Sequence, residues 1–154
     1  MNESKYFFNN EAFGMVAIAA VLKHAGRLPI SKIVLILPFL SHKETVSYLK
    51  GSNSVVRSLE ELIAKKGSLF SNFYDRYLYL LPIGLNSLLL LKEMKIISET
   101  EEGEYSFMEE SGFQFRHSSL GKRSTFVYEA SSKLAAILRD KEASELYLHL
   151  RVRL

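Results

Sequence analysis

Apolar residues recur at three- and four-residue spacing through most of this 154-residue chain, which is the period of an amphipathic helix. Glycine, proline and helix-capping residues interrupt the pattern at short intervals, and these residues are typical of helix ends. The sequence therefore predicts a mainly α-helical fold built from a series of short helices.

The first two predicted helices follow from caps and prolines. Asn9 or Asn10 is expected to cap a first helix that ends at Gly26. Leu28-Pro29 is expected to open a second helix, because proline is tolerated in a first helical turn. Its run over residues 33–37 is entirely apolar, which predicts full burial, and by length alone the run also fits a buried strand.

Two further helix starts are predicted after Pro38, which is expected to end or kink the second helix. Ser41 with Glu44, and Ser58 with Glu61, each have the spacing of a capping box. The sequence thus predicts one short helix after each serine, the second of them ending at Gly67.

An aromatic segment comes next, and its rings stand at helical spacing: Phe70, Phe73, Tyr74 and Tyr77. Core packing is the favoured interpretation, and a base-stacking platform is the alternative. Asp75-Arg76 is expected to join a surface network, and Tyr74 is a candidate contact residue. Pro82 is expected to start a new helix.

The pattern then changes to short strand-like pieces, which predict a β-hairpin at about residues 95–108. C-terminal helices are expected at about 118–150, with Ser118 or Ser119 starting the long one and Asp140 capping the last. The final residues 150–154 alternate as a strand does. They are either a frayed tail or a strand that extends a neighbour's sheet.

A helix, a turn near Gly67, two more helices and a hairpin form the order of a winged helix-turn-helix, so we expect residues 1–154 to be a single winged-helix-like helical domain. The helix at 82–94 offers few groups to a base, and four consecutive leucines within it require burial on more than one side. Residues 98–110 carry six glutamates of the chain's 17 acidic residues and no lysine or arginine, and phosphates would repel this negative charge. This hairpin is either a solvated element or an acidic contact surface.

Positive charge collects late in the chain, although the net charge is only +3. A solvated basic face is one interpretation, and a patch for DNA or for an acidic partner is the other. The candidate partner-binding residues are Lys122, Arg123, Arg151, Arg153 and Tyr74.

The sequence offers no catalytic or cofactor motif. It has no cysteine, its four histidines lie far apart, and its eight glycines form no phosphate-binding loop. We therefore expect a protein that is not an enzyme, with no metal, no cofactor and no small-molecule substrate. No stretch is long enough to cross a bilayer and no signal peptide is evident, so we expect a cytoplasmic protein.

The chain resembles the small middle component of bacterial three-component ABC-ATPase conflict systems, the group to which Lamassu-type antiphage and anti-plasmid systems belong. The resemblance extends over nearly the whole length. It is carried by Asn10-Glu11-Ala12-Phe13-Gly14, Leu28-Pro29-Ile30, Leu35-Ile36-Leu37-Pro38, Ser41-His42, Leu120-Gly121-Lys122-Arg123, Ser132-Lys133-Leu134-Ala135 and Leu150-Arg151-Val152-Arg153-Leu154.

The resemblance implies a non-enzymatic adaptor that couples an SMC- or Rad50-like ABC ATPase to an effector, often a nuclease, in a defence complex. DNA would be met only within that complex. A winged-helix DNA-binding transcriptional regulator is the alternative.

Overall fold

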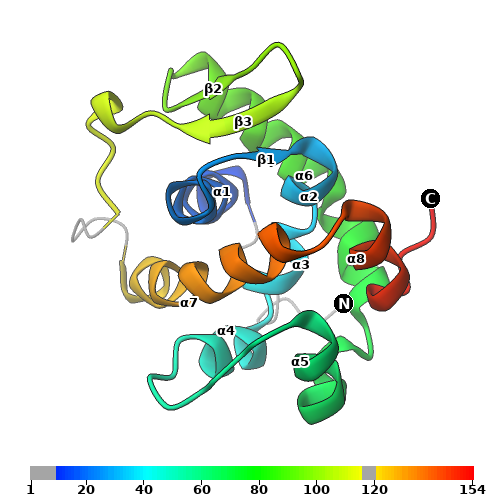
Figure 1. The fold of residues 1–154 in the computed structure, drawn as a ribbon. Coiled ribbons are helices and arrows are strands. Elements are labelled where there is room, and N and C mark those ends of the chain that lie inside the picture. The colour runs from blue at the N-terminus through cyan, green and yellow to red at the C-terminus, as the bar shows by residue number, and fades with distance from the viewer. Residues whose placement is uncertain (1–9, 116–120) are drawn as a thin grey trace.

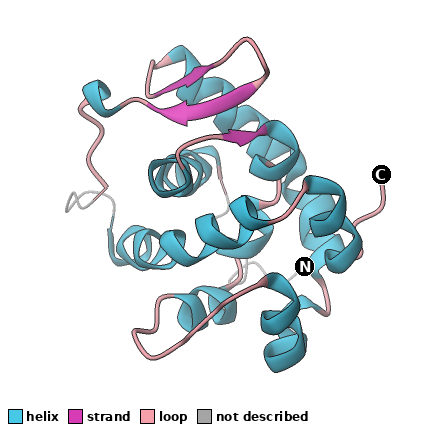
Figure 2. Ribbon diagram, viewed as in Figure 1, coloured by secondary structure: helices cyan, strands magenta, loops and turns pink. Residues whose placement is uncertain are grey.

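The computed structural model describes residues 10–115 and 121–154 of the chain (Figure 1). The described part is mainly helical, with one small antiparallel sheet, as the sequence predicts (Figure 2). The α-helices are α1 (Glu11–Ala25), α2 (Ile30–Ile33), α3 (Ile36–Leu40), α4 (Lys43–Leu49), α5 (Leu59–Lys66), α6 (Phe73–Glu93), α7 (Gly121–Asp140) and α8 (Ala143–Leu150). The strands are β1 (Leu28–Pro29), β2 (Ile97–Glu99) and β3 (Glu104–Phe107), and 3-10 helices cover Gly67–Phe70 and Glu109–Ser111.

Helix α1 is the central element of the fold. It is apolar on nearly all sides and is in contact with α6, α7, α3 and β3. Figure 1 shows it nearly end-on, with the sheet on one side and α7 on the other. Its ends are those predicted: the Asn10 side chain accepts a hydrogen bond from the Phe13 N–H at 2.9 Å, and Gly26 follows with a φ of 87°.

The predicted new helix at Pro82 is wrong, because α6 is one helix of 21 residues with Pro82 inside it. Proline removes the N–H that would bond to the carbonyl of Leu78. Pro82 and Leu78 are both exposed, so water can bond to that carbonyl instead. The cost of an interior proline is therefore reduced on this side of the helix.

The expected second helix is replaced by a strand and two short helices. Leu28 pairs with Tyr105 and Pro29 with Glu104, so β1 extends the hairpin at the free edge of β3. An edge position suits proline, which has no N–H to donate. Pro38 lies in the first turn of α3 and neither ends nor kinks the helix before it, since first-turn N–H groups have no intrahelical partner.

One of the two predicted helix starts, the one at Ser58, is confirmed. The Ser58 side chain accepts from the Glu61 N–H at 3.1 Å, and α5 ends before Gly67. The Ser41 prediction is wrong, because α4 begins after His42, whose Nδ1 lies 2.8 Å from the Thr45 hydroxyl. Ser41 instead follows the end of α3.

The hairpin is confirmed, with β2 and β3 in antiparallel register. The two C-terminal helices are also found, although the expected start at Ser118 or Ser119 lies outside the described residues. Glu142, rather than Asp140, precedes α8. Residues 151–154 form no strand, and Val152 is buried against the core.

Candidate interaction surfaces

The most distinctive surface of the molecule is the solvent side of α6. Six large apolar side chains are exposed along it: Leu78 (50%), Tyr79 (42%), Leu85 (36%), Leu89 (60%), Leu90 (38%) and, just after the helix, Met94 (60%). The opposite side of the same helix buries Phe73, Tyr77, Leu80, Leu88 and Leu91 in the core. We call the exposed side the α6 apolar face.

This face has almost no polar interruption. Asn86 is the one exposed amide on it, and charged side chains at exposed positions of α6 occur only near its ends, at Asp75, Lys92 and Glu93. Isolated exposed leucines are ordinary, but a contiguous set along one helix is a candidate interaction surface. The predicted burial of the leucine run on more than one side is thus only half fulfilled within this chain.

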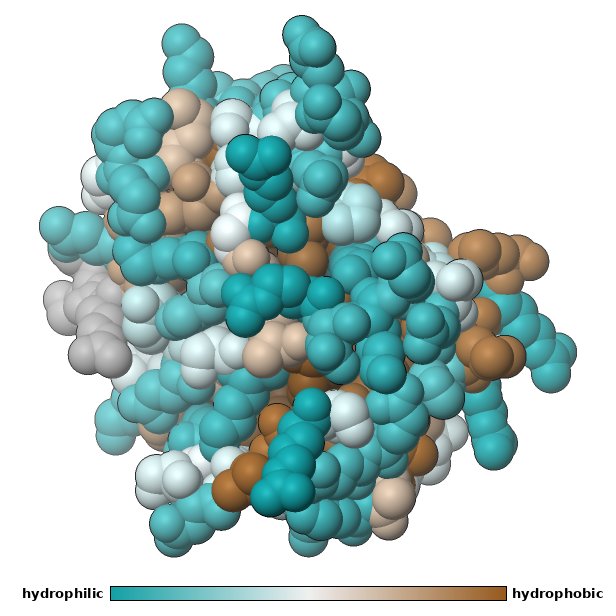
Figure 3. All heavy atoms as spheres, viewed as in Figure 1, coloured by the Kyte–Doolittle hydropathy of each residue, from teal (hydrophilic) through white to brown (hydrophobic). Residues whose placement is uncertain are grey.

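A different face of the molecule provides the contrast. The side that carries α7 and α8 is covered mainly by hydrophilic side chains, with apolar ones at scattered places (Figure 3). In the view of Figure 1, α6 runs behind the sheet, α2 and α8. The apolar exposure is therefore not a general property of the surface.

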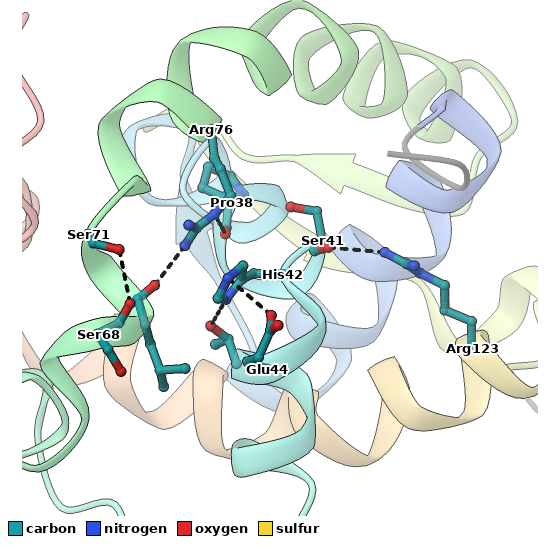
Figure 4. A network of polar contacts seen from close by, with 10 residues as sticks. Pro38, Ser41, His42, Glu44, Ser68, Ser71, Arg76 and Arg123 are labelled. Carbon is teal, nitrogen blue, oxygen red and sulfur yellow. Dashed lines mark hydrogen bonds and ion pairs between the residues drawn. The ribbon is translucent and has the colours of Figure 1, made fainter. Parts of the chain in front are cut away.

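Arg123, one of the predicted contact residues, lies where α7 meets the α3–α4 corner (Figure 4). Its Nη2 donates to the carbonyl oxygen of Ser41 at 3.1 Å, and its guanidinium lies 4.7 Å from the centre of the Phe13 ring. Burial lowers the pKa of this guanidinium from its ordinary value. Arg123 is thus a partly desolvated cation held in a defined position.

A pocket of about 340 Å³ adjoins Arg123 between α4 and α7. Its polar lining consists of Lys43, Lys50, Arg123 and Ser47, and its apolar lining of Leu40, Val46, Phe126 and Val127. The Lys50 ammonium lies 3.8 Å from the centre of the Phe126 ring, a cation–π contact. We call this the α4–α7 pocket.

The structure does not bring the other predicted residues to this pocket. Lys122 is exposed at the start of α7, whereas Arg151 and Arg153 are exposed at the C-terminus, on the other side of the molecule in Figure 1. Tyr74 is half-buried and stacks on Tyr77, with ring centres 6.5 Å apart. Their role in partner binding stays a prediction.

Lys43 and Lys50 were missed by the sequence reasoning, although a signal existed. They stand seven residues apart at the two ends of α4, so they share one side of that helix. Their convergence with Arg123, from a helix 80 positions later, is a tertiary relationship that no local pattern shows.

The acidic hairpin is partly neutralised by neighbouring lysines. Lys92 lies 2.5 Å from Glu99, and Lys23 lies 3.2 Å from Glu109. The Lys92 ammonium lowers the pKa of Glu99, chiefly by hydrogen bonding, and the pKa of Lys92 is raised in return.

Within residues 10–115 and 121–154, no group of three or more His, Asp or Glu side chains is arranged to hold a metal ion. No helix in the same ranges has the length and apolarity required to span a membrane.

One comparison with known proteins is informative. A family model described as "ABC-three component (ABC-3C) system Middle Component 3" matches residues 3–154, nearly the whole chain. No curated protein and no solved structure gives a significant match.

Proposed function

Because the chain belongs to the Middle Component 3 family of ABC-three component systems, we propose that it is a non-enzymatic adaptor. In this proposal it couples an SMC- or Rad50-like ABC ATPase to an effector, such as a nuclease. The complex would act in the cytoplasm in antiphage or anti-plasmid defence of the Lamassu type, and DNA would be met only within it.

The α6 apolar face is the observation that carries the proposal. Fully burying one leucine side chain is worth about 1.5–3 kcal/mol. Leu78 and Leu89 are at least half exposed, so a substantial part of this stabilisation is not realised in the isolated chain. A subunit of an assembly recovers it when a partner covers the helix. The face runs along most of a 21-residue helix, which is long enough to be the centre of a protein interface. We propose that the ATPase is the partner that covers it.

The test is co-purification of this chain with the ABC ATPase encoded beside it. Leu85→Asp with Leu89→Asp places two carboxylates in the α6 apolar face, and we expect recovery of the ATPase to fall at least tenfold. Leu148→Asp is the matched control, because Leu148 is 76% exposed but lies on α8. Circular dichroism and thermal unfolding establish that each variant is folded.

Undiminished recovery with the double variant would refute this interface. If the wild-type chain does not co-purify with the ATPase at all, the adaptor proposal itself fails. Charge reversal at Arg151 and Arg153, and separately at Lys122 and Arg123, tests the contacts predicted from the sequence in the same assay.

The winged-helix DNA-binding regulator remains the alternative and makes a different prediction. It requires sequence-specific DNA binding that falls steeply with salt and depends on Lys92 or Lys95. The contact of Lys92 with Glu99 favours the adaptor, because this ammonium is already neutralised by the hairpin. A gel-shift assay at moderate salt with Lys92→Gln and Lys95→Gln separates the two functions.

A further inference from the structure

We propose that the α4–α7 pocket binds a short acidic segment of another protein, with one apolar side chain on the pocket floor and carboxylates against Lys43, Lys50 and Arg123. The inference rests on the proposed function only in taking the occupant to be a protein. It concerns a surface separate from the α6 apolar face.

The charge of the lining is one-sided. Among residues 10–115 and 121–154, three cationic side chains and no acidic one line the pocket. Lys43 and Lys50 form no ion pair with any residue in the described ranges. The nearest acidic side chain on α4, Glu44, lies 3.2 Å from the Nε2 of His42. Three like charges around one cavity repel one another, and an anion placed among them relieves that repulsion.

Two of the cations are already positioned for a ligand. Arg123 is fixed by the Ser41 carbonyl and the Phe13 ring, and Lys50 by the Phe126 ring. Binding a carboxylate therefore costs less side-chain entropy than ordering free surface lysines would.

The apolar lining of the pocket favours a ligand that has an apolar group as well as negative charge. Phe126, which is 39% exposed, and the edge of Val46 form an apolar surface beneath the cations, with Leu40 and Val127 buried behind them. A phosphate or an acetate ion would leave this surface in water. About 340 Å³ is enough for one large apolar side chain with the adjoining backbone. A nucleic-acid strand presents regularly spaced phosphates and favours an extended basic groove, whereas this site has three cations over a compact apolar cavity. A peptide with an apolar residue between acidic ones fits both features.

The test uses the isolated full-length chain, labelled with ¹⁵N, and three acetylated, amidated peptides. These are Glu-Glu-Leu-Glu-Glu, its uncharged counterpart Gln-Gln-Leu-Gln-Gln, and Glu-Glu-Gly-Glu-Glu, which lacks the apolar side chain. We expect the first to shift the amide signals of Val46, Phe126 and Val127 in a saturable way. The other two should bind at least tenfold more weakly, and salt should weaken the binding of the first.

The variant is Lys43→Gln with Lys50→Gln, which should weaken binding about tenfold. Lys32→Gln with Lys95→Gln is the matched control, because it removes the same charge from lysines outside the pocket. The backbone spectrum of each variant shows directly whether it is folded.

Three results would overturn the proposal: no saturable shift with the first peptide, shifts that map away from the pocket, or equal binding by the Lys43→Gln/Lys50→Gln variant. Tighter binding of hexathymidylate at the same lysines would assign the pocket to nucleic acid instead. Because no ATPase is present, these results do not depend on the co-purification assay, so either proposal can fail alone.

Discussion

Arg76 Nε donates a hydrogen bond to the carbonyl oxygen of Pro38 at 3.0 Å, and so fastens α6 to α3 (Figure 4). The Nη2 of the same guanidinium donates to the carbonyl oxygen of Leu69, also at 3.0 Å. Arg76 is only 4% exposed, so the expected surface network at Asp75-Arg76 is wrong for the arginine. Its buried guanidinium connects α6 to α3 and to the 3-10 helix that contains Leu69.

Replacing Arg76 should lower the stability of the fold. We expect Arg76→Met to lower the free energy of unfolding by about 2–4 kcal/mol, because charge-assisted hydrogen bonds are lost and two buried carbonyls lose a donor. Urea denaturation followed by circular dichroism measures the change. Arg139→Met is the control, since Arg139 is exposed and its contacts with the His24 and Ala25 carbonyls are long, at 3.4 Å. Equal stability of the two variants would contradict the assigned role of Arg76.

Lys133 connects α7 to the loop after α4. Its ammonium donates to the carbonyl oxygens of Gly51 and Ser54 and to the Ser54 hydroxyl, at 2.5, 2.7 and 2.6 Å, which uses all three of its donors. We expect Lys133→Met to lower the free energy of unfolding by about 1–3 kcal/mol and to speed hydrogen exchange in residues 51–57. Lys141→Met should change neither measurably, because the distance from Lys141 to Glu60 is 3.8 Å and exposed pairs contribute about 0–1 kcal/mol. Unaltered hydrogen exchange in the Lys133 variant would contradict the role of Lys133 in holding the loop after α4.

The parts of the fold that the sequence predicts correctly are those fixed by local chemistry. The Asn10 cap, the Ser58 cap and the hairpin each depend on residues within a few positions of one another. The incorrect predictions concern segments whose structure depends on contacts with residues far away in the sequence. Leu28-Pro29 forms a strand because it pairs with Tyr105 and Glu104 at the edge of β3, about 75 positions later in the chain.

For the candidate surfaces too, the sequence identifies residue types, whereas tertiary packing determines where they lie. The composition of the leucine run in α6 predicts burial on more than one side, yet Leu89 and Leu90 are exposed. Which side of the helix is buried depends on how α1 packs against α6. Arg123 was selected from the sequence as a basic residue. Its position beside Lys43 and Lys50 required the α4–α7 packing.

The ion pair of Lys92 and Glu99 predicts a pH dependence at the hairpin. The folded-state pKa of Glu99 is lowered by Lys92, so the stabilisation is complete above the ordinary glutamate pKa of about 4.3 and is lost as the pH falls through the folded-state value. The pKa of Lys92 is raised, so the pair also persists below the ordinary lysine pKa of about 10.4 and is lost as the pH rises through the higher folded-state value.

A ¹³C NMR titration of the Glu99 carboxyl checks this dependence. We expect its midpoint to lie below the ordinary value in the wild-type chain and to rise in Lys92→Met. Lys95→Met, which removes a nearby lysine that forms no ion pair with Glu99, should leave it in place. An ordinary midpoint in the wild-type chain would show that the pair does not persist in solution.

Helices α1 and α6 approach each other closely at Gly14 and Ser87. A Cβ added at Gly14 would lie 2.1 Å from the Ser87 Oγ and 3.0 Å from its Cβ. Ser87 is fully buried, and its hydroxyl donates to the Ile83 carbonyl at 2.7 Å and lies 3.2 Å from that of Glu11. The hydroxyl cannot turn away without losing these bonds, so the two helices must separate to accept a methyl group.

We therefore expect Gly14→Ala to lower the free energy of unfolding by about 1–3 kcal/mol, although alanine alone would favour the helix by about 1 kcal/mol. Ser87→Gly should restore part of this loss in the double variant, because it removes both atoms that the new methyl group meets. A double-mutant cycle by urea denaturation measures the coupling. Gly84→Ala is the control, since the described atom nearest to its added Cβ is the Leu37 Cδ1, at an ordinary contact distance of 3.7 Å. Strict additivity of Gly14→Ala and Ser87→Gly would mean that the helices do not approach so closely here.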